Sequence, residues 1–453
     1  MKPVLKKLKV ALVNTRIEER QNVPLGLLYL ASAIWHICEV KIFDPDIGLK
    51  GAYGDIYEIF AFKPDIIAFT SMTQNWERTK EFINAFKIDL PGRPKIIVGG
   101  IHATVCPDEV RNTPGVDAVC VGDGEEWLYN YISGENKLFD FDTQFPAYHL
   151  MPQVERYLDS IGTFGALTPQ RRIDIITGKG CYGKCIYCAS GSLGDKIKRR
   201  SVVSVVAEIK LRRRQFGNVT FLFTDDTFTA NTLWTVKFCR AVKPLKIKWS
   251  CSTRADRITE SLVKLMKESG CLHIGVGVES GSPAMLKVLK KGVTREQYIE
   301  AFRILHKYRI MAGATFILGT PGETEKDIEL TKSLLRTIKP NVSSFFYMTP
   351  FPGTELYDMV KAEYTHRKPI GTSTSDCPVL YNPAISNTRY IEIRKELDKL
   401  TSWWTLQSYL HVSTLWWVIC NMTPKRAVRL LHTWHTKTMY DALYEFLQST
   451  RKD

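Results

Sequence analysis

The 453-residue sequence has no internal repeat and no low-complexity tract, which excludes repeat and fibrous architectures. It also lacks a disulfide framework, because 11 cysteines are too sparse in a chain of this length. The first residues, MKPVLKKLKVALVNT, are basic and then apolar but contain no small-residue cleavage site for export. We therefore expect a cytoplasmic protein with reduced thiols.

Acidic residues are in deficit, with 47 Asp and Glu against 62 Lys and Arg and a net charge of +15. Such a balance suits an acidic partner, an anionic cofactor or nucleic acid. The basic runs KIKRR (196–200) and KLRRR (210–214) are interpreted as solvated faces. The length predicts two or three domains.

Residues 1–135 alternate short apolar runs with helix-length segments. This rhythm predicts a parallel sheet with helices on both faces, that is, an α/β doubly wound, Rossmann-like domain. Ligands of such sheets bind beyond the carboxyl ends of the strands, so the residues there are the binding candidates. The apolar runs are VALVN (10–14), VKIFD (40–44), DIIAFTS (65–71), KIIVGG (95–100) and AVCVG (118–122).

Residues 136–170 show no clear period and are interpreted as a linker. A second series of strands and helices follows over 171–385, and six strands are too few for an eight-stranded barrel, so we expect a partial (β/α)6 barrel. Residues 386–453 are expected to form a helical, Trp-rich C-terminal domain. The six apolar runs are DIITG (174–178), VTFLFTD (219–225), KWSCST (248–253), HIGVGVES (273–280), GATFILGT (313–320) and VSSFFYMTPF (342–351).

A compact cysteine motif follows the first of these six strands. GKGCYGKCIYCAS (178–190) places Cys181, Cys185 and Cys188 in a C-x3-C-x2-C pattern. Three thiolates on one loop can hold three irons of a [4Fe–4S] cubane and leave the fourth iron open. A zinc knuckle is the alternative, but it needs a fourth ligand and paired C-x2-C spacings, whereas the other cysteines are scattered singly.

With this motif the stretch 171–360 resembles the radical S-adenosylmethionine (SAM) superfamily. Further matches are FTDDTF (223–228), STRADRI (252–258), GVES (277–280), LGTPGET (318–324) and TPFPGTELY (349–357). The resemblance implies that the three cysteines bind the cluster, that Tyr187 lies against the adenine, that Arg254 meets the methionine carboxylate and that Glu279 binds the ribose or the amino group. The SAM-binding residues implied in full are Tyr187, Asp226, Ser252, Arg254, Glu279 and Ser280.

The N-terminal domain resembles the cobalamin-binding domain of the radical SAM enzymes that methylate unactivated carbons. The matching stretches are VPLGLLYLAS (23–32), SMTQNWERT (71–79), VGGIHATVCPDEV (98–110) and VGDGEEWL (121–128). The motif D-x-H-x-x-G is missing, so we expect cobalamin without a histidine on cobalt. The cobalamin-binding residues implied are Asn14, Pro24, Gly26, Ser71, Met72, Thr73, Trp76, Gly99, Gly100, His102, Ala103, Gly122, Gly124 and Glu125.

Together these resemblances imply a cobalamin-dependent radical SAM C-methyltransferase. One SAM would methylate cobalamin, and a second would give the 5′-deoxyadenosyl radical that abstracts hydrogen from an unactivated carbon of the substrate. The expected substrate is a protein residue, as in the enzymes that C-methylate a glutamine of methyl-coenzyme M reductase, and the expected electron donor is a flavodoxin or ferredoxin. A lipid or tetrapyrrole substrate, as in hopanoid methylases or the anaerobic cyclase of chlorophyll synthesis, is the rival.

Two other functions fit the sequence less well. A tRNA methylthiotransferase would need three more cluster-type cysteines in the first domain, and Cys38, Cys106 and Cys120 match that pattern poorly, so nucleic acid is not favoured. A cobalamin sensor leaves the cysteine motif unexplained. Residues 400–424 carry no charged side chain, and we expect this segment to form a buried helical cap, with an interfacial membrane helix as the alternative.

Overall fold

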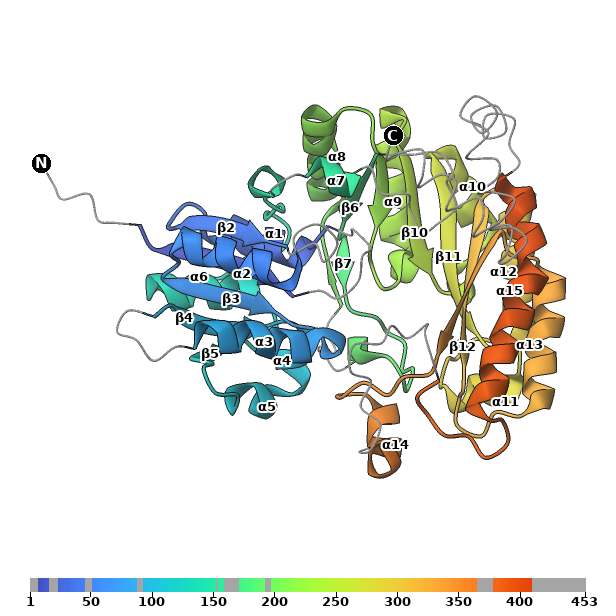
Figure 1. The fold of residues 1–453 in the computed structure, drawn as a ribbon. Helices are drawn as coiled ribbons and strands as arrows, with labels where there is room; N and C mark the ends of the chain where they lie inside the picture. The colour runs from blue at the N-terminus through green and yellow to red at the C-terminus, as the bar shows by residue number, and fades with distance from the viewer. Residues whose placement is uncertain are drawn as a thin grey trace, which may run out of the picture. The chain divides into compact units, whose positions relative to one another are not determined.

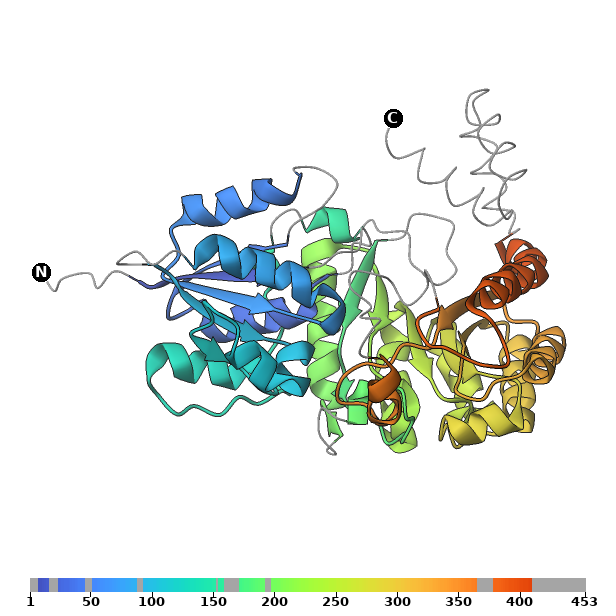
Figure 2. The ribbon, with the colours of Figure 1, turned by 60° about the horizontal axis from the view of Figure 1, so that its bottom comes forward.

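The computed structural model describes residues 7–15, 23–44, 51–87, 93–151, 154–158, 171–191, 197–364 and 378–409. The chain forms two compact units (Figures 1 and 2). The first comprises Met1–Tyr157, Tyr187–Lys196 and Pro350–Ser373, and the second comprises Leu158–Ile186, Ile197–Thr349 and Thr374–Asp453.

The first unit contains a parallel sheet which, within the described residues, has five strands in the order β2-β1-β3-β4-β5. This is the flavodoxin-like doubly wound order. Asn14 pairs with Thr70 and Thr70 with Gly99, so the strands end at one common edge. The strands are β1 (Lys9–Asn14), β2 (Glu39–Phe43), β3 (Ile66–Thr70), β4 (Lys95–Gly99) and β5 (Ala118–Val119).

Helices cover both faces of this sheet, as the sequence predicts. On one face α2, α3 and α5 bury apolar residues such as Ile59, Phe82 and Val110 against Val13 and Ile67 of the strands. On the other face α1 packs against α6 and against β1 and β2. The helices of the unit are α1 (Leu25–Ile34), α2 (Gly51–Phe62), α3 (Trp76–Phe86), α4 (Ile101–Val105), α5 (Pro107–Arg111), α6 (Gly124–Ser133) and α14 (Glu355–Tyr364), with the 3-10 turns η1 (Thr73–Asn75), η2 (Tyr148–Leu150) and η3 (Ala189–Gly191). The predicted linker holds η2 and the short helix α7 (Glu155–Leu158).

The second unit contains a parallel sheet in which six described strands follow one another in chain order, from β6 at one edge to β13 at the other. This confirms the partial (β/α)6 barrel. A small antiparallel ribbon, β7 with β8, stands apart from it. The strands are β6 (Arg172–Ile175), β7 (Gly178–Lys179), β8 (Lys198–Arg199), β9 (Thr220–Phe223), β10 (Lys248–Thr253), β11 (Cys271–Glu279), β12 (Met311–Leu318) and β13 (Val342–Tyr347).

The barrel core between β9, β10 and α9 is aromatic. Trp249 is fully buried, and its ring lies 5.3–5.6 Å from the rings of Phe223, Phe228 and Phe238. This cluster fixes the outer helix onto the two strands whose ends carry candidate site residues. The helices of the unit are α8 (Val202–Phe216), α9 (Thr232–Val242), α10 (Glu260–Glu268), α11 (Pro283–Val288), α12 (Arg295–Lys307), α13 (Glu325–Ile338) and α15 (Asn387–Tyr409), with the 3-10 turns η4 (Phe228–Ala230), η5 (Lys243–Leu245) and η6 (Ala255–Arg257).

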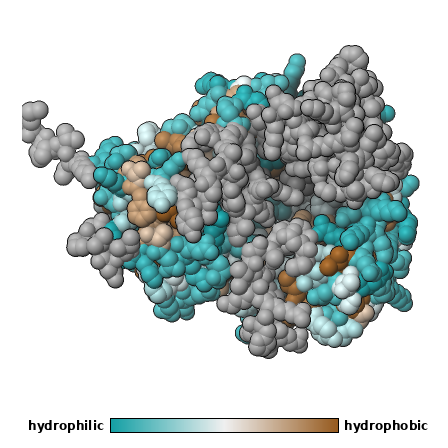
Figure 3. Space-filling view, viewed as in Figure 1, coloured by the Kyte–Doolittle hydropathy of each residue, from teal (hydrophilic) through white to brown (hydrophobic). Residues whose placement is uncertain are grey.

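The C-terminal segment begins, as predicted, with a helix. α15 packs against β13, and Arg389 and Glu396 of α15 pair with Glu325 and Lys332 of α13. Residues 410–453, which include Trp416, Trp417 and Trp434, lie outside the described residues, so the cap remains a prediction. Among the described helices, none combines the length and apolarity that crossing a bilayer requires. Figure 3 shows a largely hydrophilic described surface on the face drawn there.

Candidate cofactor sites

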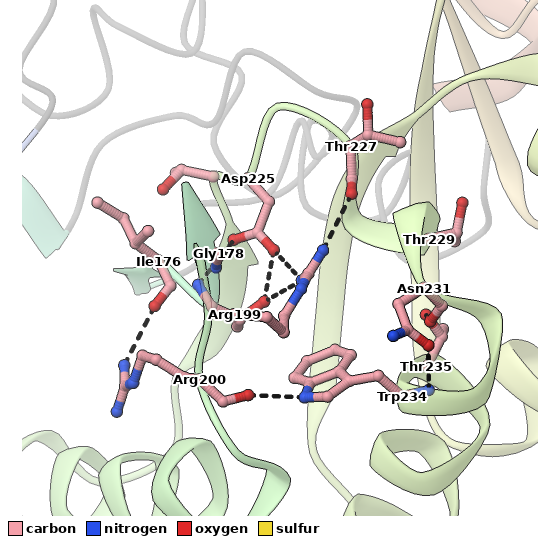
Figure 4. Close-up of polar contacts among 12 residues, drawn as sticks. Ile176, Gly178, Arg199, Arg200, Asp225, Thr227, Thr229, Asn231, Trp234 and Thr235 are labelled. Atoms are coloured by element: carbon pink, nitrogen blue, oxygen red, sulfur yellow. Dashed lines mark hydrogen bonds and ion pairs between the residues drawn. The ribbon is translucent and has the colours of Figure 1, made fainter. Parts of the chain in front are cut away.

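The base of the cysteine loop is fixed by a buried carboxylate (Figure 4). Asp225, just beyond β9, accepts hydrogen bonds from the backbone N–H of Thr177 (2.7 Å) and Gly178 (3.1 Å). Arg199 of β8 donates to the same carboxylate at 2.6 Å. The ribbon from which the loop leaves and to which it returns is therefore tied to the end of β9.

The positive charge of Arg199 compensates the negative charge of the buried Asp225 carboxylate. Burial raises the pKa of Asp225, while the Arg199 guanidinium and the bonds from residues 177 and 178 lower it. Arg199 also stacks over the Trp234 ring, 4.7 Å from its centroid, and Trp234 Nε1 donates to the backbone oxygen of Arg200 at 2.7 Å. Figure 4 shows these side chains converging from β8, β9 and α9.

Two of the predicted cluster ligands lie around one glycine. A Cβ on Gly183 would stand 3.4 Å from Cys181 Sγ and 3.7 Å from Cys185 Sγ, so the backbone forms a cradle for the two sulfurs. The Gly183 N–H donates to Cys181 Sγ at 3.3 Å. Cys188 follows three residues after Cys185 and is half-buried. Two soft sulfur donors close together, with a backbone N–H pointing at one of them, suit a site that binds iron through thiolates.

Arg254 reaches this loop from the end of β10. Its Nη1 lies 3.1 Å from the position of a Gly183 Cβ, its Nη2 donates to the backbone oxygen of Lys291 at 2.7 Å, and its Nε donates to Asp256 at 3.0 Å. Burial opposes the charge, but Asp256 and Tyr182 outweigh it and raise the pKa of Arg254. Arg254 is thus a positioned cation beside the cysteines.

Glu279 ends β11 in the left-handed region, at φ +67°, beside a β-bulge. Its carboxylate accepts a hydrogen bond from Lys291 Nζ at 2.8 Å, and both side chains are more than nine-tenths buried. Burial opposes the lysine's charge, but Glu279 and Cys185 raise the pKa of Lys291. Lys291 and Tyr182 were not predicted from the sequence, because their contacts with Glu279 and Arg254 depend on which strand ends meet. For Tyr182, the available signal was an aromatic residue inside the cysteine motif.

The remaining predicted SAM residues lie in different surroundings. Asp226 is exposed, whereas its neighbour Asp225 is buried in the loop base. Ser252 and Tyr187 are half-buried. Ser280 is buried, its hydroxyl 3.3 Å from that of Thr331 and accepting from the Ser282 N–H at 3.1 Å. Ser280 is thereby engaged in the turn after β11.

At the carboxyl edge of the first sheet, Gly100 allows two strand ends to meet. Its φ is +96°, and a Cβ there would stand 2.6 Å from the Ser71 backbone oxygen. Ser71 is fully buried, its N–H donates to Gly99 O at 2.9 Å, and its O accepts from the His102 N–H at 3.1 Å. The edge therefore presents close-packed backbone to a ligand.

His102 is turned into the domain. Its ring lies 4.8 Å from that of Trp76, and its Nδ1 lies 3.3 Å from the Thr73 hydroxyl. Its Nε2 is 3.8 Å from Glu109, and burial lowers the pKa of His102, so the contact is with a neutral imidazole. His102, Cys106 and Glu109 offer metal-type ligand atoms within 4.8 Å. Because Trp76 Nε1 already donates to Glu109 at 2.8 Å, we assign no metal there.

The other predicted cobalamin residues surround the same edge. Asn14 donates to Asp44 at 3.0 Å, and the Gly122 N–H donates to the Thr104 hydroxyl at 3.0 Å. Pro24 caps α1. Exposure differs among the rest: Met72 and Gly26 are exposed, Glu125 and Gly124 are half-buried, and Ala103 is buried.

Comparison with known proteins identifies the two domains. Residues 175–335 match the Radical SAM superfamily, and residues 19–132 match the B12 binding domain. The chain is 28% identical over 375 residues to an uncharacterized methyltransferase of Pyrococcus horikoshii, covering 76% of this chain and 79% of that protein. It is 25% identical over 360 residues to the bacteriochlorophyllide d C-12(1)-methyltransferase of Chlorobaculum tepidum, covering 76% and 75%.

The fold is also similar to a solved structure. The radical SAM methyltransferase TsrM from Kitasatospora setae, solved with tryptophan substrate and a SAM analog, gives a TM-score of 0.65 at 18% identity, covering 80% of this chain and 77% of that one. The two domain families imply a [4Fe–4S] cluster, SAM and cobalamin as cofactors. With a B12 binding domain, a radical SAM domain and methyltransferases among its relatives, the chain belongs to the cobalamin-dependent radical SAM methyltransferases.

Proposed function

We propose that Cys181, Cys185 and Cys188 hold the cluster and that Arg254, Glu279 and Lys291 bind the amino-acid end of SAM. The observation that carries this is the meeting of a guanidinium and a buried Lys–Glu pair beside the cysteine loop. Arg254 Nη2 donates to the Lys291 backbone oxygen at 2.7 Å, its Nη1 lies 3.1 Å from the position of a Gly183 Cβ, and Lys291 Nζ donates to Glu279 at 2.8 Å. A guanidinium pairs with a carboxylate, and the Glu279 carboxylate suits an ammonium or hydroxyl group. When bound, the cluster and SAM supply radical chemistry and cobalamin supplies the methyl group.

For the first domain we propose that cobalamin lies over the edge formed by Ser71, Gly99, Gly100 and Gly122. Backbone groups approach a ligand most closely where side chains are small, and these positions combine glycines with a buried serine. The His102 imidazole, which packs on Trp76, is proposed to stabilise this edge and not to bind cobalt.

For the substrate we propose a residue of an acidic protein, with a glutamine of methyl-coenzyme M reductase as the specific candidate. The net charge of +15 supports a large acidic partner and an acidic electron donor such as flavodoxin or ferredoxin. A tetrapyrrole is the second candidate, favoured by the similarity to the bacteriochlorophyllide methyltransferase.

The test uses the full-length, anaerobically reconstituted enzyme with SAM carrying a deuterated methyl group. We expect mass spectrometry to find the label on one glutamine of the candidate protein together with 5′-deoxyadenosine, and neither product with Arg254→Ala. A candidate protein in which that glutamine is changed to asparagine is the matched control. Label on a tetrapyrrole instead, with the protein unmodified, would overturn the substrate proposal.

A further inference from the structure

We propose that Thr227 is a positioning residue whose hydroxyl donates a hydrogen bond to Cys181 Sγ and thereby raises the reduction potential of the cluster. The inference rests on the proposed function of the cysteine loop. Thr227 Oγ1 lies 3.4 Å from Cys181 Sγ, within hydrogen-bond reach of sulfur. A thiolate bound to iron carries no proton, so the hydroxyl must be the donor.

Thr227 is held in place for this role. It is 1% exposed, it precedes η4, and its backbone oxygen accepts a hydrogen bond from Arg199 at 3.3 Å (Figure 4). Arg199 is in turn fixed by Asp225 and by the ring of Trp234. The backbone of Thr227 is therefore held to the base of the loop, and burial limits the space in which its side chain can move.

The electrostatic argument gives a direction. Reduction adds an electron whose charge is shared with the cysteine sulfurs, so a donor to sulfur stabilises the reduced cluster more than the oxidised one. The low dielectric of a buried site enlarges this difference. Among the described residues, two neutral donors contact Cys181 Sγ, the Thr227 hydroxyl and the Gly183 N–H. The charge of the neighbouring Arg199 is paired with Asp225.

The experiment compares threonine variants of the full-length reconstituted protein. Thr227→Val keeps the shape and removes the hydroxyl, Thr227→Ala removes it without a branched side chain, and Thr227→Ser restores it. Thr229→Val is the matched control, since Thr229 is equally buried in the same segment and bonds to the Thr253 hydroxyl rather than to a cysteine. Iron content is measured first, and the midpoint potential is then followed by electron paramagnetic resonance.

We expect the ratio of reduced to oxidised cluster at a fixed poise to fall about tenfold in Thr227→Val and Thr227→Ala, a shift of about 59 mV for one electron. Thr227→Ser and Thr229→Val should match the wild type. Unchanged midpoints in iron-replete Thr227→Val and Thr227→Ala would overturn the proposal, as would an equal shift in Thr229→Val. A wild-type protein that assembles no cluster would instead overturn the proposed function.

Discussion

At the scale of single residues, the buried pair of Lys291 and Glu279 makes the sharpest prediction. Removing one partner leaves an uncompensated buried charge, which costs about 3–5 kcal/mol. We expect Glu279→Ala and Lys291→Met each to lower the free energy of unfolding by about that amount and to weaken SAM binding about tenfold, or ~1.4 kcal/mol. Denaturant titration and calorimetry measure the two effects.

A combined variant separates stability from binding at this pair. Glu279→Gln with Lys291→Met removes both charges, so it should recover most of the stability lost in the single variants while SAM binding stays weak. Lys287→Met, on the exposed face of α11, is the control and should leave both unchanged. Wild-type SAM affinity in the combined variant would remove the pair from the SAM site.

Glu323, in the turn after β12, predicts a pH dependence of stability. It is 1% exposed, and burial raises the pKa of its carboxyl to about 7, against about 4.3 in an unfolded chain. The folded state therefore holds a proton that the unfolded state loses. Its stabilising contribution, about 4 kcal/mol, is complete below pH about 4 and is lost as the pH rises to about 7.

Glu323→Gln keeps an acceptor for the Gly319 N–H without the charge. We expect this variant to match the wild type near pH 4.5 and to exceed its guanidinium midpoint at pH 8. If the guanidinium midpoints of both proteins change in parallel between these pH values, Glu323 does not titrate as proposed.

At the scale of elements, the aromatic cluster between α9 and the barrel predicts a large effect from one substitution. Trp249→Ala removes a fully buried ring that contacts three others, and such truncations cost about 3–5 kcal/mol. Leu233→Ala, at a side chain of α9 that is 76% exposed, should change the free energy of unfolding by less than about 0.5 kcal/mol. Similar effects from both changes would refute the role of the cluster.

The elements also show which parts of the fold can be predicted from sequence. Runs such as VALVN (10–14) were recognisable because all-parallel strands are buried on both faces and so read as continuous apolar stretches. β5 is shorter than its predicted run, and the ribbon of β7 and β8 was not predicted, because two-residue strands have no period to detect. The position of the cysteine loop could be predicted from the C-x3-C-x2-C spacing alone.

The polar partners in the candidate site were harder to predict. Lys291 lies in the sequence LKKGV with nothing to distinguish it from Lys290, and only the fold brings it to Glu279. The resemblance implies Asp226 as a SAM-binding residue, which stays a prediction, whereas the role of Asp225 in the loop base is visible only in the fold. The roles of Lys291 and Asp225 depend on contacts between residues far apart in the sequence, which local patterns do not encode.

At the scale of the whole molecule, cobalamin binding should proceed without a protein histidine on cobalt. The ring of His102 is buried, packs on Trp76 and contacts the Thr73 hydroxyl, which supports this expectation. Electron paramagnetic resonance of the cob(II)alamin form should show no superhyperfine splitting from a protein nitrogen, and His102→Ala should give the same spectrum. Nitrogen splitting that disappears in His102→Ala would show that the histidine binds cobalt.

The measurement that tests the account most directly is the cofactor content of the full-length protein after anaerobic reconstitution with iron, sulfide and cobalamin. We predict about four iron atoms and one cobalamin per chain in the wild type, with release of 5′-deoxyadenosine from SAM on reduction. Replacing Cys181, Cys185 and Cys188 together by alanine should abolish the iron and the 5′-deoxyadenosine and leave cobalamin bound. A triple variant that keeps about four irons, or a wild type that retains no cobalamin, would contradict the assignment.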